Sequence, residues 1–135
     1  MSAILLVEDE VVDVMAFRRA MRKAELACPI EVFSDGEEVL ASARAGDFPS
    51  PCFLVLDLNL PRLPGLDLLQ ALRRESHLAG CSVAVLTSST ADADRERARS
   101  LGVSAYLVKS DRSALGRLVD LVRVHAETTH SLCSH

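Results

Sequence analysis

The sequence has no stretch of about 20 consecutive apolar residues, which is the length that a membrane-spanning helix needs. Near the start, the apolar run Ala3–Val7 is short and no basic residue precedes it. A secretory signal peptide would need a charged start and a longer apolar segment. We therefore expect a cytoplasmic protein that does not enter a membrane.

Positive charge is also in short supply. The 135-residue chain has 15 Lys and Arg against 19 Asp and Glu, which gives a formal net charge of −4. Its densest basic run, Arg95 to Arg99, contains Glu96 and follows two further acids. Domains that bind nucleic acids usually carry a basic surplus. The charge balance therefore argues against nucleic acid as a partner.

The cysteines form no C-x-x-C pair, a spacing typical of zinc and redox sites. They are Cys28, Cys52, Cys81 and Cys133. Cysteines of this kind in a reducing compartment are free thiols, and we expect the same here. Cys133 shares the C-terminal tail with His130 and His135, and fraying in solvent is a simpler interpretation of that tail than a metal site.

Short apolar runs alternate with amphipathic stretches along the chain. The five runs are Ala3–Val7, Ile30–Phe33, Phe53–Leu56, Ser82–Leu86 and Ser104–Val108. Four of them lack the polar alternation of a half-exposed strand, which is typical of parallel strands covered on both faces. The run Ile30–Phe33 does alternate, so it is expected at a sheet edge.

The stretches between the runs have helical periodicity and cap signals. They cover residues 10–26, 36–45, 65–75, 91–101 and 111–126. Strands alternating with helices predict an α/β fold, a flavodoxin-like doubly wound sheet of five parallel strands in the order 2-1-3-4-5 with five helices. We expect one domain over residues 1–127 and a flexible tail over 128–135.

Only Ser34 and Asp35 follow the second run, which is expected at the sheet edge. The predicted strand order brings together the polar residues that follow the other four runs. They are Glu8 and Asp9, Asp57 and Asn59, Thr87 and Ser88, and Lys109. Three carboxylates at one place would repel one another and raise each other's pKa. A hard divalent cation with oxygen ligands would relieve this repulsion, and Mg²⁺ is the expected ion.

Asp57 ends an apolar run, where an unpaired charge is costly. A carboxylate can attack phosphorus and form an aspartyl-phosphate, whose oxygens then need positive partners and donors. Lys109 offers a charge and Thr87 a hydroxyl group. Each residue alone has a simpler explanation as a helix cap or a solvated surface group. Their coincidence at four neighbouring strand ends favours Asp57 as a phosphoacceptor.

Four motifs in order make the chain resemble the CheY-like receiver domains of two-component response regulators over about residues 3–126. The motifs are ILLVEDE, LVLDLNLPRLPG, AVLTSS and AYLVKS. The resemblance implies that Mg²⁺, or Mn²⁺ or Ca²⁺ in its place, is held by Glu8, Asp9, Asp57 and the backbone carbonyl of Asn59. It also implies that a sensor histidine kinase phosphorylates Asp57.

The resemblance further implies a switch. Thr87 would swing towards the aspartyl-phosphate, and Tyr106 would move inward behind it. Asn59 and Ser89 would flank the route of the hydrolytic water and set the phosphate lifetime. The protein would then be no enzyme beyond slow self-catalysed phosphoryl transfer and hydrolysis. One departure is Ser110, which stands where the family usually has proline after the lysine. The loop that follows Lys109 therefore either bears the cost of a cis non-proline bond, about 3 kcal/mol, or is trans and shaped differently.

The segment VEDEVVDVMAFRRAM is similar to the opening of single-domain receivers that partner bacterial phytochrome kinases. This narrower resemblance implies a bacteriophytochrome as partner and no output or DNA-binding domain. Val11 and Met15 lie off the core stripe of the first helix and are candidates for kinase docking. The last helix has a wider apolar arc than packing on a sheet needs. We therefore expect a homodimer, with Leu121 and Val124 in its surface.

Other classes of function remain open from the residues alone. A phosphohydrolase that uses an aspartyl-phosphate would need a second acid at position 59, where this chain has Asn59. A flavodoxin-like cofactor binder would need a phosphate-cradling loop after the first strand, where EDEVVD is acidic. A pseudo-receiver, or a dimeric interaction module without phosphorylation, would not need all five key residues intact.

Overall fold

The computed structural model describes residues 3–48, 52–75, 78 and 80–129. Five parallel strands form one sheet in the order β2-β1-β3-β4-β5, as predicted. The strands are β1 (Ile4–Val7), β2 (Ile30–Phe33), β3 (Phe53–Leu56), β4 (Ser82–Thr87) and β5 (Ala105–Val108).

Five helices connect and follow the strands. They are α1 (Val11–Lys23), α2 (Gly36–Arg44), α3 (Gly65–Arg74), α4 (Asp92–Ser100) and α5 (Ala114–Thr129). The first four are slightly shorter than predicted, whereas α5 begins three residues later and extends beyond residue 127. The predicted group of Cys133, His130 and His135 lies outside the described residues. None of the described helices is long and apolar enough to cross a membrane.

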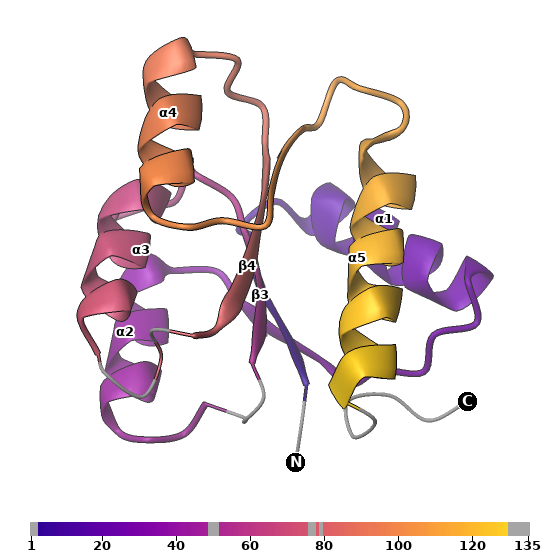
Figure 1. The fold of residues 1–135 in the computed structure, drawn as a ribbon, viewed down its shortest axis with the longest axis horizontal. Helices are drawn as coiled ribbons and strands as arrows, with labels where there is room; N and C mark the ends of the chain where they lie inside the picture. The colour runs from indigo at the N-terminus through magenta and orange to yellow at the C-terminus, as the bar shows by residue number, and fades with distance from the viewer. Residues whose placement is uncertain (1–2, 49–51, 76–77, 79, 130–135) are drawn as a thin grey trace.

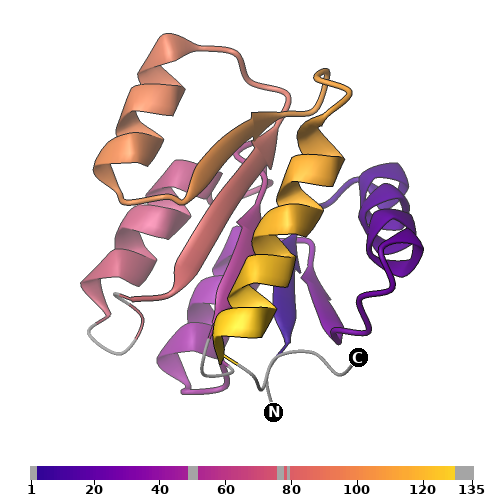
Figure 2. The ribbon, with the colours of Figure 1, turned by 45° about the vertical axis from the view of Figure 1, so that its right-hand side comes forward.

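The helices form two layers, one on each face of the sheet. Figure 1 shows α2, α3 and α4 on one side of the strands and α1 and α5 on the other. In Figure 2, α5 runs across the sheet with α1 beside the same face. Alternate residues of β1 pack against opposite helix layers. Ile4 is in the same core cluster as Phe17 of α1, and Leu5 is in the same cluster as Leu68 of α3. This two-sided burial explains the absence of polar alternation.

The strand order determines which strands lie at the edges of the sheet and which strand ends are neighbours. Both β2 and β5 lie at an edge, and the alternating run of β2 leaves Glu31 exposed, as predicted. Backbone bonds continue the pairing beyond the strands, from Glu8 N–H to Phe33 O and from Asp57 N–H to Val7 O. The carboxyl ends of β1 and β3 are therefore fixed side by side.

The expectation of free thiols is wrong for the three described cysteines, Cys28, Cys52 and Cys81. Cys52 and Cys81 form a disulfide, and none of the described cysteines is a free thiol. Each of the two stands directly before a strand, and Phe53 pairs with Ser82 in the sheet. The Cα atoms of Cys52 and Cys81 are consequently 5.0 Å apart, which is within the normal range for a disulfide. Adjacent strand starts were the sequence signal for this pair.

Candidate functional site

Three carboxylates converge at the carboxyl edge of the sheet. Glu8 and Asp9 follow β1 and Asp57 follows β3, and each offers one oxygen within 4.8 Å of the others. Glu8 and Asp57 are only 3% and 4% exposed, while Asp9 faces solvent. A cluster of carboxylate oxygens that is open on one side is the donor set that a hard divalent cation prefers. The residues therefore fit Mg²⁺ or Mn²⁺.

Lys109, which follows β5, reaches into this cluster. Its Nζ lies 2.8 Å from Glu8 Oε1, 2.8 Å from Asp13 Oδ2 and 3.1 Å from Asp57 Oδ2. Sequence reasoning missed Asp13, although the residue stands in the first turn of α1. Its position shortly after the acidic pair Glu8 and Asp9 was the available signal, but the sequence does not show where its side chain points. Three carboxylates therefore share one ammonium group at this site.

Burial and the crowding of charged groups shift the pKa values of Glu8 and Lys109. Burial raises the pKa of Glu8 to about 7, against the bond from Lys109, and the negative charge of Asp57 adds to the rise. Burial alone would lower the pKa of Lys109, but its bonds to Asp13, Glu8 and Asp57 together raise that pKa instead. Lys109 therefore stays charged, and the cluster around it would gain from further positive charge.

Both oxygens of Asp57 have partners. Oδ1 accepts a hydrogen bond from the Asn59 backbone N–H at 3.2 Å, and Oδ2 receives Lys109 Nζ. The exposed side chain of Asn59 donates through Nδ2 to Ser88 Oγ at 3.1 Å. The loop after β3 thus touches both the predicted phosphoacceptor and the loop after β4.

The two predicted switch residues meet at Ser89. Thr87 is fully buried at the end of β4, and its Oγ1 accepts the Ser89 N–H at 3.3 Å. Tyr106 on β5 is half-buried, and its hydroxyl donates to Ser89 O at 3.1 Å. The Ser89 hydroxyl donates to Asp94 of α4 at 2.6 Å. A single residue therefore connects Thr87, Tyr106 and α4.

The predicted contact surfaces are only partly exposed. Val11 and Met15 are exposed on α1, together with Val12, which the sequence reasoning missed. On α5, Val124 is 60% exposed, whereas Leu121 is half-buried and packs against the core cluster of α1 and α5. Val124 is therefore the better candidate for an external contact.

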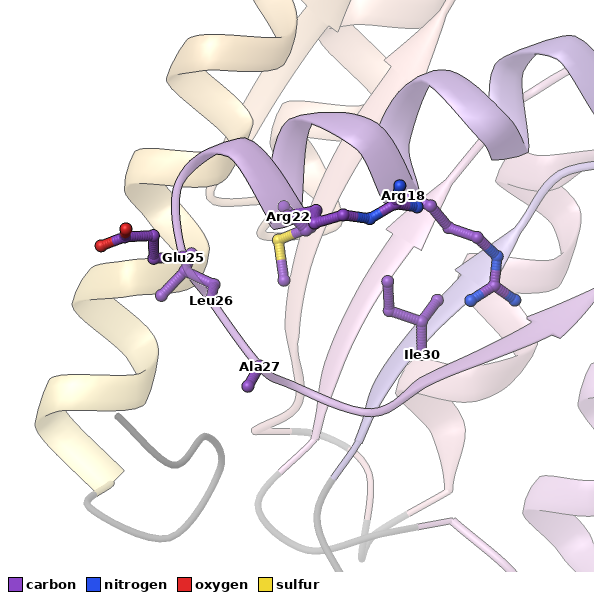
Figure 3. Close-up of a pocket in the computed structure, with 7 residues that line it drawn as sticks. Arg18, Arg22, Glu25, Leu26, Ala27 and Ile30 are labelled. Carbon is purple, nitrogen blue, oxygen red and sulfur yellow. The ribbon is translucent and has the colours of Figure 1, made fainter.

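Two hollows flank α1. One of about 230 Å³ lies beside the carboxylates, and Asp13, Lys109 and Arg112 line it together with apolar side chains of β4 and α5. The other, of about 380 Å³, lies at the far end of α1 and contains none of the predicted site residues. Figure 3 shows Arg18 and Arg22 of α1 and Ile30 of β2 along this second hollow. Only the first hollow adjoins the candidate site.

Similar proteins of known sequence include a probable regulatory protein and a response regulator. The probable methanogenesis regulatory protein FilR2 of Methanothrix harundinacea is 38% identical over 109 residues, which cover 78% of this chain and 70% of that protein. The response regulator Rcp1 of Synechocystis sp. is 31% identical over 111 residues, which cover 79% of this chain and 76% of Rcp1.

Solved structures of the same kind match the fold. The Mn²⁺-bound form of Rcp1 has a TM-score of 0.79 at 27% identity, covering 91% of this chain and 92% of that one. The phosphorylated cyanobacterial phytochrome response regulator RcpA gives 0.77 at 27% identity, covering 98% and 96%. The bacteriophytochrome response regulator RtBRR gives 0.74 at 31% identity, covering 90% and 76%. Residues 4–122 match the model of the response regulator receiver domain, and this chain belongs to that family of two-component signalling proteins.

Proposed function

We propose that this receiver domain accepts a phosphoryl group on Asp57 from a sensor histidine kinase, with Mg²⁺ bound, and signals through protein–protein contacts. One observation carries the proposal. A nearly buried aspartate lies beside two further acids and 3.1 Å from a lysine ammonium group, at the end of a sheet strand. A carboxylate in this setting is shielded from bulk water and already faces a positive group.

In the proposed reaction, an Asp57 oxygen forms a bond to phosphorus while the bond from phosphorus to the histidine nitrogen breaks. Bound Mg²⁺ supplies positive charge that offsets the charge of the phosphoryl oxygens. Glu8, Asp9, Asp57 and the carbonyl of Asn59 would hold this ion. Lys109 would turn from the carboxylates to a phosphoryl oxygen, and Thr87 would donate its hydroxyl to another.

The proposed switch uses the Ser89 junction. If Thr87 turns towards the phosphoryl group, the bond from Ser89 N–H to its hydroxyl breaks, and Tyr106 loses its fixed partner as the loop moves. Helix α4 buries only the side chain of Ala98, so a shift of this helix disturbs little of the core. A local change of charge would thereby alter the surface formed by α4, β5 and α5.

The lifetime of the phosphorylated state is a further part of the proposal. Asn59 and Ser89 stand on the two loops beside Asp57, and the Asn59 side chain is exposed. Their size and polarity would govern how water approaches the aspartyl-phosphate. Hydrolysis and transfer would be slow, self-catalysed steps of a signalling cycle rather than enzymatic turnover.

We propose a bacteriophytochrome kinase as the partner, because two of the similar structures, RcpA and RtBRR, are named as phytochrome response regulators. The exposed apolar group of Val11, Val12 and Met15 on α1 would meet the kinase beside the acceptor site. Met15→Asp should slow phosphotransfer from such a kinase by about tenfold but leave transfer from a small phosphodonor unchanged. Equal loss with both donors would contradict docking.

We also propose a homodimer through α4, β5 and α5, supported by the exposure of Val124. Val124→Asp should convert a dimer to a monomer in light scattering, while Asp120→Asn on the same helix, also exposed, should not. Leu121 is a poorer test, because its substitution would also disturb the core. A wild-type protein that is monomeric before and after phosphorylation would contradict the proposal.

The function itself is tested by intact mass after incubation with phosphoramidate and Mg²⁺. We expect one added phosphoryl group in the wild type, none in Asp57→Asn, and none when a chelator removes the metal. Lys109→Met should reduce the yield strongly, and Lys23→Met is the matched control because Lys23 is exposed on α1. A folded wild type without any adduct would favour a pseudo-receiver or an interaction module without phosphorylation.

A further inference from the structure

Arg62 connects the loop after Asp57 to the start of α2. Its Nε lies 2.9 Å from Asp35 Oδ2, and its Nη1 lies 3.7 Å from Glu37 Oε2. Asp35 is the N-cap of α2 and accepts the Glu37 N–H on Oδ1 at 2.7 Å, and its side chain is only 6% exposed. The arginine therefore covers a buried carboxylate whose two oxygens are both engaged.

The backbone at Arg62 adopts a conformation that residues with a Cβ atom disfavour. Its φ is +63°, and Leu63 N–H bonds to Pro61 O at 2.7 Å. A three-residue turn with positive φ at its centre is the rarer and more strained form of the γ-turn. Strained residues persist where their surroundings hold them in place. The ion pair with Asp35 is a contact that holds this one.

Close backbone packing fixes the same loop on two sides. A Cβ atom on Gly36 would lie 2.7 Å from Leu63 O, so the first turn of α2 sits directly against the loop. A Cβ atom on Gly65 would lie 2.4 Å from Asp57 O, so the first turn of α3 sits directly against the acceptor. The loop between Asp57 and Gly65 carries Asn59, whose N–H donates to Asp57 Oδ1.

We propose that the Arg62–Asp35 ion pair is a positioning clamp for this loop, and that it sets the affinity of the acidic cluster for a divalent cation. The clamp rests on the proposed function, since it acts on the Asn59 carbonyl and the Asp57 carboxylate as cation ligands. Through it, the edge strand β2 contributes to the site, although the residues after β2 do not reach the carboxylates themselves. Arg62 is a positioning residue and touches no reacting atom.

If Arg62 acted only through its charge, its removal would change the cation affinity in the direction opposite to that expected for a clamp. Loss of a positive charge near a cation site strengthens cation binding, whereas loss of a clamp weakens it. Outer residues that orient metal ligands typically change metal affinity by about 10- to 100-fold. The sign of the change in affinity therefore separates the two explanations.

The experiment is titration of unphosphorylated protein with Mn²⁺ by calorimetry. We expect Arg62→Gln and Asp35→Asn each to weaken binding by about 10-fold, and the double variant to be no weaker than the single variants, because both break one contact. Arg62→Lys should recover most of the affinity. Arg99→Gln is the matched control, since Arg99 is 73% exposed and pairs with an equally exposed Glu96.

A second readout needs no cation. Amide hydrogen exchange at Asn59 should be at least several-fold faster in Arg62→Gln than in the wild type or Arg99→Gln, because the bond to Asp57 Oδ1 is less well held. Mn²⁺ binding by Arg62→Gln that equals or exceeds wild-type binding would overturn the clamp alone. A wild type that binds no Mn²⁺ would overturn the proposed function and, with it, the clamp.

Discussion

Thr87 and Tyr106 bond to opposite ends of one residue: the Thr87 hydroxyl accepts the N–H of Ser89, and the Tyr106 hydroxyl donates to its carbonyl. The two side chains come from neighbouring strands, β4 and β5, with Val85 opposite Tyr106 in the register. The guanidinium of Arg95 lies 4.7 Å above the Tyr106 ring and ties the same tyrosine to α4. A movement of Thr87 is thus coupled to Tyr106 through one peptide segment.

Tyr106→Phe tests this coupling. The substitution removes the bond to Ser89 O but keeps the ring under Arg95, so the free energy of unfolding should fall by about 1 kcal/mol. Urea unfolding of the unphosphorylated protein measures the loss. Thr87→Val removes the other bond at equal side-chain size. If the two bonds act through the same segment, the double variant should lose less than the sum of the two single losses, and strict additivity would contradict the coupling.

Glu8 predicts how stability depends on pH in the absence of metal. Its pKa in the folded protein is about 7, above its ordinary value of 4.5, chiefly because of burial. The folded state therefore binds more protons than the unfolded state between these values. This stabilising contribution is fully present below about pH 4.5 and is lost as the pH rises through 7.

The measurement is urea unfolding in chelator at several pH values between 4.5 and 8. The wild type should lose stability relative to Glu8→Gln as the pH rises across this range, and added Mg²⁺ should restore part of it at pH 8. Glu31→Gln controls for the loss of an exposed acid on β2. Parallel pH profiles for the wild type and Glu8→Gln would show that Glu8 ionises at its ordinary value.

The disulfide makes a separate prediction for stability. It joins residues 29 positions apart, and closing a loop of this length should stabilise the fold by about 3–4 kcal/mol through the unfolded state. Without reductant, the variant with both Cys52→Ser and Cys81→Ser should be less stable than the wild type by that amount. With reductant, the two proteins should unfold at nearly the same urea concentration. Equal stability under both conditions would indicate free thiols in solution.

The fold was predictable because its signals are periodic. Apolar runs of strand length, separated by helical patterns, fix the number of elements, and the polar residues after β1, β3, β4 and β5 mark one edge of the sheet. Lys109 and Asp57 are 52 residues apart, yet the strand order alone places them together. Contacts between residues that follow different parallel strands can therefore be predicted from the sequence.

Contacts that depend on individual side chains were not predictable in this way. Asp13 joins the site because the first turn of α1 points its carboxylate back at Lys109, and no periodic pattern records that direction. The pair of Cys52 and Cys81 was missed because an expected reducing compartment outweighed the strand register. Arg62 contacts Asp35 only because the loop turns through a positive φ, which the sequence does not reveal for arginine.

Two glycines give a direct test of how tightly the acceptor strand packs on α3. A Cβ atom on Gly65 would lie 2.4 Å from the Asp57 carbonyl oxygen, whereas one on Gly116 in α5 would meet nothing within 4 Å. Gly65→Ala should lower the free energy of unfolding by about 1–3 kcal/mol, because the backbone must shift to admit the methyl group. Gly116→Ala should raise it by about 0.5–1 kcal/mol, because alanine favours the helix.

Urea unfolding compares both variants with the wild type. The same shift should move the Asp57 carboxylate, so Gly65→Ala should also bind Mn²⁺ more weakly, whereas Gly116→Ala should bind it as the wild type does. A Gly65→Ala protein with unchanged stability would contradict the close approach of α3 to the Asp57 carbonyl oxygen. Unchanged Mn²⁺ binding in a destabilised Gly65→Ala would mean that the strain is relieved in α3, away from the carboxylate.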